Sequence, residues 1–212
     1  MASMEGSGDR SQACFIVLDG IDGCGKSTQA RELVGWLTKR GGEVLHVREP
    51  GTTALGEALR ELLLARGPEL SSGVETLLFA AARRQMLDEV VGPALARGAH
   101  VVCERFHAST FAYQAFAADE AEEEVLNLLR TFAGTPAPDL TIVLRVDPRV
   151  ASARRGSPGD RIEDRGLDFQ IRVAEGFERY AELSPEVVMV DADAAPAEVA
   201  GRIREEFERV GA

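Results

Sequence analysis

The stretch Gly20-Ile21-Asp22-Gly23-Cys24-Gly25-Lys26-Ser27 decides the fold of this chain of 212 residues. It lies between a short apolar run and a segment with helical periodicity. Glycines in such a turn permit torsions that direct several N–H groups into one anion-sized concavity, and the helix N-terminus adds a favourable dipole. Lys26 adds a point charge for the β- and γ-phosphates, and the Ser27 hydroxyl can ligate Mg²⁺. The stretch therefore predicts a phosphate-binding loop for a nucleoside triphosphate.

Strand and helix patterns alternate along the rest of the chain. Short runs rich in Val, Ile and Leu predict five buried strands: Cys14 to Leu18, Val44 to Val47, Val101 to Cys103, Leu140 to Val146 and Val187 to Val190. Four stripes at helical spacing accompany them: Ala30, Leu33, Val34 and Leu37; Leu55, Leu59, Leu62 and Leu63; Val125, Leu128, Leu129 and Phe132; Val199, Ile203, Phe207 and Val210. This alternation predicts an α/β fold, a parallel sheet with helices on both faces, which binds ligands beyond the carboxyl ends of its strands.

The composition narrows the class of protein. An apolar content of 45% and a charged content of 28% are typical of a globular protein. The net charge of -11 argues against a nucleic-acid or anionic membrane partner, and no apolar run approaches the ~20 residues of a membrane helix. Three cysteines without metal-like spacing indicate reduced thiols and a cytoplasmic location. We expect a flexible tail over residues 1–13 and a single domain over residues 14–212.

Arginines follow the second and third predicted strands, at the edge where ligands are expected. They belong to Arg48-Glu49-Pro50-Gly51 and to Glu104-Arg105-Phe106. A guanidinium at this edge suits a phosphate or a carboxylate. Rings, a cation and an amide that could stack on and hydrogen-bond a base are supplied by Phe79, Arg83, Tyr113 and Gln114. Taken one at a time, these four residues also suit a helix core or a solvated face.

Taken together and in order, five motifs resemble bacterial thymidylate kinase, a family of P-loop nucleoside monophosphate kinases, from about Cys14 to the C-terminus. The motifs are Asp19-Gly20-Ile21-Asp22-Gly23-Cys24-Gly25-Lys26-Ser27-Thr28, Arg48-Glu49-Pro50-Gly51, Phe79-Ala80-Ala81-Ala82-Arg83, Glu104-Arg105-Phe106-His107-Ala108-Ser109-Thr110-Phe111-Ala112-Tyr113-Gln114 and Asp160-Arg161-Ile162-Glu163. The resemblance implies a three-layer P-loop kinase fold with a short lid at about residues 152–162. It also implies a homodimer that phosphorylates dTMP to dTDP with ATP as donor and Mg²⁺ as cofactor.

The resemblance implies how the phosphate and the base of dTMP are bound. Arg105 and Arg60 would bind the phosphate group, and Phe79 would stack on thymine. Arg83 and Gln114 would address the polar edge of the base. These roles suit the side chains, because a guanidinium is a planar fork for phosphate and an amide carries both a donor and an acceptor.

For the sugar and the nearby waters, the resemblance implies a second set of residues. Asp22 would hold the 3′-OH or a water–metal network, and Tyr113 would crowd the 2′ position and favour deoxyribose. Glu49 would organise waters near the acceptor phosphate. Ser109 and Thr110 complete the implied acceptor site.

On the donor side, the resemblance implies an ATP site made of the loop and lid residues Gly20, Asp22, Gly23, Cys24, Gly25, Lys26, Ser27, Thr28, Arg154 and Arg155. Ser27 and Glu104 would serve Mg²⁺. The implied catalytic residues are Lys26, Arg105, Arg161 and Asp22. Bacterial-type members carry a catalytic arginine in the lid, whereas the eukaryotic pattern places one directly after the aspartate of the loop, where this chain has Gly23. Arg161 is the lid arginine whose motif matches most closely.

Two departures from the family pattern bear on the acceptor site. Glu104 stands where the family usually has Asp, and Ala115 to Glu120 replaces a glycine-rich stretch. One alternative is a kinase for dUMP or a deoxynucleoside, and another is a nucleotide-binding regulator without transfer activity. A GTPase is disfavoured because Asn127 is the only asparagine, so no guanine-reading Asn-Lys-x-Asp exists. Since the acceptor is already an anionic phosphate oxygen, we expect His107 to be a local structural group.

Overall fold

The computed structural model of the chain describes residues 13–67, 69–155 and 159–210. The predicted tail over residues 1–13 lies almost entirely outside the described residues, and so does the middle of the predicted lid. Within the described residues, no helix is both long enough and apolar enough to cross a membrane.

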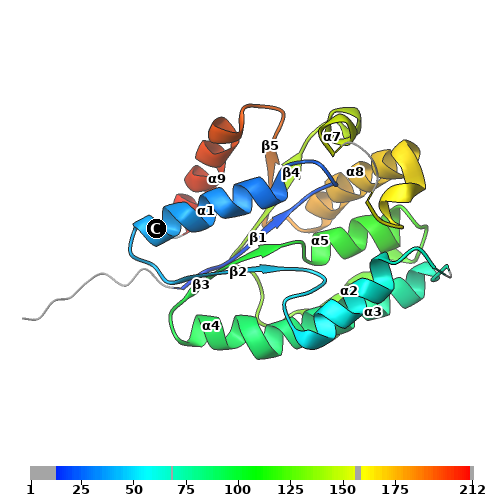
Figure 1. Ribbon diagram of the computed structural model, residues 1–212, viewed down its shortest axis with the longest axis horizontal. Helices are drawn as coiled ribbons and strands as arrows, with labels where there is room; N and C mark the ends of the chain where they lie inside the picture. Colours follow the sequence, from blue (N-terminus) through cyan, green and yellow to red (C-terminus); the bar gives the residue numbers. More distant parts are fainter. Residues whose placement is uncertain (1–12, 68, 156–158, 211–212) are drawn as a thin grey trace, which may run out of the picture.

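Five parallel strands form one sheet in the order β2-β3-β1-β4-β5, as the sequence predicted (Figure 1). Their bounds are β1 Phe15–Asp19, β2 Val44–Arg48, β3 His100–Glu104, β4 Leu140–Arg145 and β5 Val187–Asp191. Each differs from its predicted range by at most one residue at either end. The chain order reverses between β1 and its two neighbours, β3 and β4. A ligand site is therefore expected beyond the carboxyl end of β1, where the phosphate-binding loop begins.

The two faces of the central strand support two separate hydrophobic clusters. Ile16 and Leu18 of β1 pack with residues of α1 (Lys26–Lys39) and α9 (Pro196–Val210). Phe15 and Val17 point to the opposite face and pack with residues of a π-helix, η1 (Leu87–Val91), and of α4 (Gly92–Ala96). Side chains that alternate between two apolar layers are the signature of a buried parallel strand. The three-layer arrangement predicted from the sequence is confirmed.

Further helices cover the sheet or lie beyond its carboxyl edge. They are α2 (Ala54–Leu64), α3 (Ser72–Met86), α5 (His107–Thr110), η2 (Phe111–Phe116), α6 (Glu122–Ala133), α7 (Pro148–Arg155), the 3₁₀ turn η3 (Glu163–Arg165) and α8 (Gly166–Leu183). Helices α2 and α3 lie side by side. They carry Arg60, Phe79 and Arg83, which the sequence predicted for the acceptor site.

One predicted apolar stripe is divided between core and surface. In α2, Leu63 is fully buried, whereas Leu55 and Leu62 are 45% and 54% exposed. The neighbouring α3 exposes Val74 and Leu77 in the same way, at 42% and 57%. Helical periodicity finds an apolar face but does not say what covers it. Within this chain, that face is only partly covered.

Candidate active site

A cavity of about 850 Å³ lies at the carboxyl ends of β1, β2 and β3. Its walls come from the phosphate-binding loop, the segments after β2 and β3, helices α2 and α3, the lid, and the segment that joins β5 to α9. The cavity brings together most of the residues that the sequence predicted. Those that line it include Asp22, Gly23, Cys24, Gly25, Lys26, Ser27, Thr28, Glu49, Arg60, Phe79, Arg83, Glu104, Arg105, Ser109, Thr110, Tyr113, Gln114 and Arg154.

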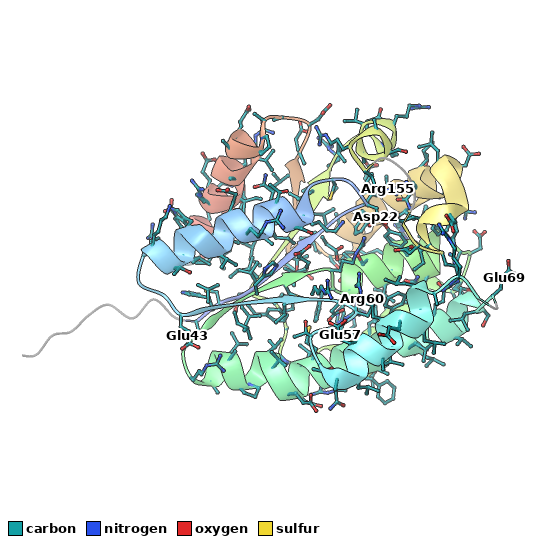
Figure 2. The ribbon with its side chains drawn as sticks, in the orientation of Figure 1. Asp22, Glu43, Glu57, Arg60, Glu69 and Arg155 are labelled. Carbon is teal, nitrogen blue, oxygen red and sulfur yellow. The ribbon has the colours of Figure 1, made fainter. Side chains whose placement is uncertain are left out.

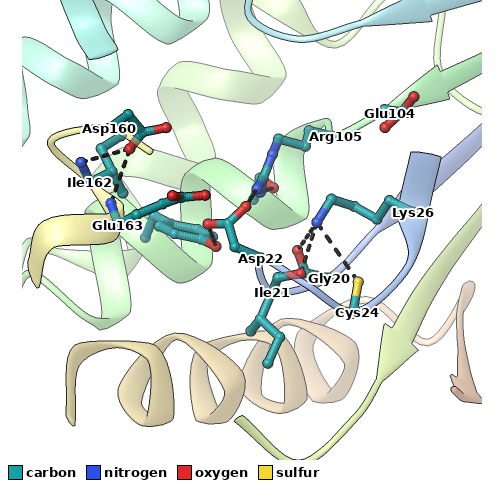
Figure 3. Close-up of polar contacts among 12 residues, drawn as sticks. Gly20, Ile21, Asp22, Cys24, Lys26, Glu104, Arg105, Asp160, Ile162 and Glu163 are labelled. Carbon is teal, nitrogen blue, oxygen red and sulfur yellow. Dashed lines mark hydrogen bonds and ion pairs between the residues drawn. The ribbon is translucent and has the colours of Figure 1, made fainter. Parts of the chain in front are cut away.

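The phosphate-binding loop has the backbone geometry that its glycines predict. Gly20, Gly23 and Gly25 have positive φ values of 134°, 84° and 102°, which side chains rarely permit. Helix α1 begins at Lys26, and its N-cap has no side-chain hydrogen bond. The Lys26 Nζ donates to the carbonyl oxygens of Gly20 at 2.9 Å and Ile21 at 2.8 Å (Figure 3). The loop therefore holds its lysine across the turn, beside a helix N-terminus suited to an anion.

Gly23 also fixes how the lid helix meets the loop. A Cβ atom at this position would lie 2.2 Å from the carbonyl oxygen of Ala151 in α7. No side chain fits there without moving α7. The approach of lid and loop is thus possible only with glycine at position 23.

Glu104 joins the loop to β2. The Ser27 hydroxyl donates to one carboxylate oxygen of Glu104, and His46 Nε2 lies 2.9 Å from the other. Burial acts to raise the pKa of Glu104, but the hydrogen bonds from His46 and Ser27 outweigh it and lower the pKa. Hydroxyl and carboxylate oxygens are hard ligands that suit Mg²⁺, which also takes waters and phosphate oxygens. The residues present therefore fit the predicted metal. His46 was not identified from the sequence.

The loop aspartate is bound from two sides. Arg105 Nη2 forms an ion pair with one oxygen of Asp22, and the Tyr113 hydroxyl donates to the other at 2.8 Å. Arg105 also donates to Ser109 Oγ at 2.9 Å, and its guanidinium lies over the Tyr113 ring at 5.3 Å. Burial acts to raise the pKa of Asp22, but Arg105, Lys26 and the Tyr113 hydroxyl outweigh it and lower the pKa to about 2. Asp22 is therefore an anion at neutral pH.

Asp19 at the end of β1 organises the segment after β3, a role not predicted from the sequence. The side chain is fully buried. One oxygen accepts from the backbone N–H groups of Phe106 and Ser109, both at 3.0 Å, and the other accepts from Ser109 Oγ at 2.5 Å. Arg105, directly before Phe106, has a φ of 70°, in the left-handed region. Asp19 thus holds the turn that directs Arg105 into the cavity.

Arg83 is buried between α3 and the segments after β2 and β3. Its Nε donates to Glu49 at 2.6 Å, and its Nη2 donates to the Phe106 carbonyl and to Thr110 Oγ1, both at 3.0 Å. Arg83 Nη1 has no hydrogen-bond partner among the described residues, and neither does Glu49 Oε1. Burial raises the pKa of Glu49 to about 7, and the opposing effect of Arg83 is smaller. Arg83, which lines the cavity, therefore keeps one donor that the described residues leave unpaired.

The remaining acceptor-side residues occupy one wall. Phe79 is half-buried and lines the cavity. Arg60 donates from Nη1 to the Pro50 carbonyl at 3.0 Å, and burial lowers its pKa. Gln114 is buried and donates from Nε2 to Glu75 at 3.1 Å. Glu75 was not identified from the sequence, because nothing in its local pattern distinguishes it from other first-turn acidic residues of a helix.

The three predicted lid arginines lie in different surroundings. Arg154 lines the cavity and donates to the Ala192 carbonyl at 3.1 Å. Arg155 lies beside Asp22 (Figure 2), whose pKa it helps to lower. Arg161 does not line the cavity: its Nε and Nη2 donate to the Leu63 carbonyl at 3.2 and 2.8 Å. Of these three arginines, Arg154 lines the cavity, whereas Arg155 and Arg161 do not. Arg155 acts on the charge of Asp22 in the loop, and Arg161 is directed to Leu63.

His107 has local contacts, as expected. Its Nε2 lies 2.8 Å from the Ala133 carbonyl, and its ring stacks on Phe106 at 4.3 Å. Burial lowers the pKa of His107 to about 3, so the imidazole is neutral. It does not line the cavity.

A phosphate-binding loop that faces a second group of arginines and an aromatic ring across one cavity defines a P-loop phosphotransferase for a small phosphorylated acceptor. The thymidylate kinase family model matches residues 18–203, and the chain belongs to that family. It is therefore a phosphotransferase that acts on dTMP.

Curated thymidylate kinases resemble the chain over most of its length. The protein of Synechococcus sp. (strain JA-3-3Ab) is 43% identical over 190 residues, which are 89% of this chain and 92% of that protein. The protein of Neisseria meningitidis serogroup A is 42% identical over 92% of this chain and 96% of its own length. The protein of Thiobacillus denitrificans is 45% identical over 88% of this chain and 94% of its own length.

Proposed function

We propose that this protein transfers the γ-phosphoryl group of ATP to dTMP, forming dTDP and ADP, with Mg²⁺ at the Ser27–Glu104 pair. The observation that carries the proposal is the position of Arg105. Its guanidinium lies in the same cavity as the phosphate-binding loop and contacts the loop through Asp22. A cation at that point suits the phosphate of an acceptor directly opposite the γ-phosphate of a donor.

On the donor side, we assign the phosphates of ATP to the loop N–H groups from Gly20 to Thr28 and to Lys26. The loop torsions and the uncapped start of α1 support this assignment. Mg²⁺ would be held by Ser27 and Glu104, and when bound it neutralises charge on the β- and γ-phosphates. Arg154 at the opposite end of the cavity contacts the segment after β5, where the adenine would lie.

On the acceptor side, we assign the dTMP phosphate to Arg105 and Arg60 and the thymine ring to the face of Phe79. The unpartnered Nη1 of Arg83 suits the O4 carbonyl of the base, and Gln114 would address N3.

The sugar of dTMP would contact the remaining residues of this wall. Asp22 would accept a hydrogen bond from the 3′-OH of the sugar. Tyr113, whose hydroxyl donates to Asp22, would leave no room for a 2′-OH. Glu49 would organise water near the phosphate. Ser109 and Thr110 position Arg105 and Arg83 through their hydroxyl groups.

The reaction forms a bond between a dTMP phosphate oxygen and the γ-phosphorus as the bond from that phosphorus to the bridging oxygen of ADP breaks. The attacking oxygen is anionic, so the protein supplies positioning, charge and exclusion of water rather than a strong base. A lid cation would stabilise the transferring group. The sequence assigned this role to Arg161, but its contacts with Leu63 and Glu75 favour Arg155, whose Nε and Nη1 have no hydrogen-bond partner among the described residues.

We also propose that the protein is a cytoplasmic homodimer. The exposed Leu55 and Leu62 of α2 and the exposed Val74 and Leu77 of α3 lie on two neighbouring helices. Apolar side chains gathered on adjacent helices are typical of a surface that a second copy covers. The same helices carry Arg60, Phe79 and Arg83, so the association would support the acceptor wall.

A coupled ADP-release assay over a panel of nucleosides and monophosphates tests the function. We expect dTMP to give the highest kcat/KM. Faster turnover of dCMP or dGMP would contradict the assignment of the acceptor, and a preference for dUMP or a deoxynucleoside would redirect it. Binding of ATP without consumption of any acceptor would instead indicate a nucleotide-binding regulator.

A further inference from the structure

Glu75 is a fully buried carboxylate behind the acceptor wall. It lies in the first turn of α3 and does not line the cavity. One of its oxygens accepts from Arg161 Nη1 at 2.7 Å and from Arg165 Nη2 at 2.6 Å. The other accepts from Gln114 Nε2 at 3.1 Å. A single carboxylate thus connects two residues at the foot of the lid with a residue of the acceptor site.

The chemistry of a carboxylate determines which way Gln114 points. An ionised carboxylate only accepts hydrogen bonds, whereas an amide has one accepting and one donating end. Gln114 must therefore turn its nitrogen to Glu75, and its oxygen faces away from Glu75. Because Gln114 lines the cavity, that oxygen is the end available to a ligand.

Arg161 and Arg165 keep the carboxylate in place. Arg161 is itself fixed, because two of its other nitrogens donate to the Leu63 carbonyl. Arg165 packs over the ring of Phe169 at 4.8 Å. Both arginines contact the same oxygen of Glu75, which leaves the second oxygen for Gln114. Two cations also balance the charge of a carboxylate that has no exposure to water.

Position on α3 links Glu75 to the base-binding residues. Glu75, Phe79 and Arg83 follow one another at intervals of four residues, so they lie along one side of the helix. In the proposed function, Phe79 contacts the face of the base and Arg83 its O4. Gln114 lines the same cavity, and in the proposed function it addresses N3 of that base.

We propose that Glu75 is a positioning residue for base selection, because it fixes the Gln114 amide with its oxygen toward the acceptor. The oxygen then accepts from the N3–H group of thymine and rejects a base with a lone pair at N3. The proposal rests on the proposed function, since it requires dTMP in this cavity. It assigns no contact with the substrate to Glu75 itself.

The substitution Glu75→Gln tests the proposal because it replaces one carboxylate oxygen with an NH₂ group and keeps the shape of the side chain. Arg161 and Arg165 would retain the oxygen of the new amide, so its nitrogen would face Gln114. Two amide NH₂ groups cannot form a hydrogen bond with each other, because both are donors. The Gln114 amide would therefore rotate by about 180° and direct its oxygen to position 75. Its nitrogen would then face the cavity and favour a base with an acceptor at N3.

The matched acceptors are dTMP and 5-methyl-2′-deoxyisocytidine 5′-monophosphate. Both have the 5-methyl group and the O4 carbonyl that Arg83 would contact, but the second has a lone pair at N3 and an amino group at C2. We expect the Glu75→Gln protein to shift the kcat/KM ratio of the two acceptors by about 10- to 100-fold toward the isocytidine compound. Glu75→Asp, which keeps a carboxylate that only accepts, should retain the wild-type ratio even if the protein melts at a lower temperature.

A Glu75→Gln protein that is folded by circular dichroism and keeps the wild-type ratio contradicts the proposal while leaving dTMP phosphorylation intact. Equal loss of activity with both acceptors contradicts it too, because that result indicates structural support alone. Should Glu75→Gln fail to fold, Gln114→Leu tests the amide on which the proposal depends. The ratio of kcat/KM for dTMP to kcat/KM for the isocytidine compound should then fall toward unity, and an unchanged ratio overturns the proposal. Absence of dTMP turnover in the wild-type protein would instead contradict the proposed function, and this proposal with it.

Discussion

Arg105, which follows β3 with a left-handed backbone, forms an ion pair with Asp22 inside the phosphate-binding loop. The pair links the proposed acceptor and donor halves of one cavity. Figure 3 shows it beside the contacts of Lys26. Under the proposed function, the position of the acceptor phosphate would thus depend on a residue assigned to the ATP site.

Replacement of Arg105 tests the acceptor-phosphate assignment. Arg105→Ala should lower kcat/KM for dTMP by about 100-fold or more, since removal of one charge-stabilising donor costs that much in related chemistry. Arg105→Lys should recover only part of the activity because lysine lacks the planar fork. Steady-state kinetics on both variants give the answer, with Arg97→Ala as a control in an exposed ion pair with Glu43. Near-normal turnover in folded Arg105→Ala would rule the assignment out.

Lys26 provides the corresponding test on the donor side. Lys26→Ala should lower turnover by about 100-fold or more, because the γ-phosphate loses a point charge during transfer. The fold should persist, since Lys26 contacts only the loop carbonyls and Cys24 in the hydrogen bonds of the described residues. Circular dichroism and the dTMP assay together distinguish loss of chemistry from loss of structure.

Asp22 should make stability depend on pH in the acid range. Its pKa in the folded protein is about 2, below the ordinary 3.8, so its contribution is present above pH 3.8 and is lost as the pH falls toward 2. The free energy of unfolding of the wild type relative to Asp22→Asn should decrease by about 2 kcal/mol across that window.

Urea unfolding at several pH values between 5 and 2 measures the difference. Asp119→Asn, in an ion pair with Arg172 that is more exposed than the Asp22–Arg105 pair, is a matched control that should show a smaller dependence. A difference between wild type and Asp22→Asn that does not change with pH would mean that Asp22 is not held as an anion.

Substitutions of Arg155 and Arg161 should have different effects, the first on kcat and the second on stability. Arg155→Gln should lower kcat by about 1,000-fold with little change in the Kd of ATP, as expected for a cation that acts on the transition state. Arg161→Gln should mainly lower the melting temperature, because it leaves Glu75 and the Leu63 carbonyl without one partner. Single-turnover kinetics with both variants decide between them. A larger loss of kcat in Arg161→Gln would restore the role that the sequence suggested.

The exposed apolar face of α2 and α3 predicts the oligomeric state. Leu62→Glu or Leu77→Glu should convert a dimer into monomers. Each substitution is present twice in a twofold interface, so the free energy of dimerisation should become less favourable by about 3 kcal/mol or more. Size-exclusion chromatography with light scattering measures the mass. Leu167→Glu, at an exposed leucine on α8, should leave the mass unchanged. A wild-type protein that is monomeric at micromolar concentration would contradict the prediction.

The sheet and the phosphate-binding loop could be predicted from the sequence because both depend on local patterns. Buried parallel strands are continuous apolar runs, and the loop needs glycines followed by Lys26 and Ser27 at fixed spacing. Arg105, Arg83 and Gln114 were found because they belong to motifs of a family to which the chain proved to belong.

The residues that the sequence did not reveal act over long separations in the chain. Asp19 holds a segment that starts 87 residues later, and Glu75 holds Arg161, 86 residues later. His46 contacts Glu104 from a neighbouring strand, 58 residues away. No local spacing marks such pairs. The exposure of Leu55 and Leu62 could not be predicted for a related reason, because helical periodicity does not say which part of an apolar face is covered.

The carbonyl of Ala151 occupies the space that any side chain at position 23 would need. A side chain on the loop at position 23 and the backbone of α7 cannot occupy this space at the same time. A change from glycine to arginine at this position would not simply add a second cation, since it would displace α7, the helix that carries the proposed catalytic Arg155. A change from an arginine in the lid to an arginine in the loop would therefore require substitutions in both the loop and α7. A protein with only one of these changes would be a poor enzyme.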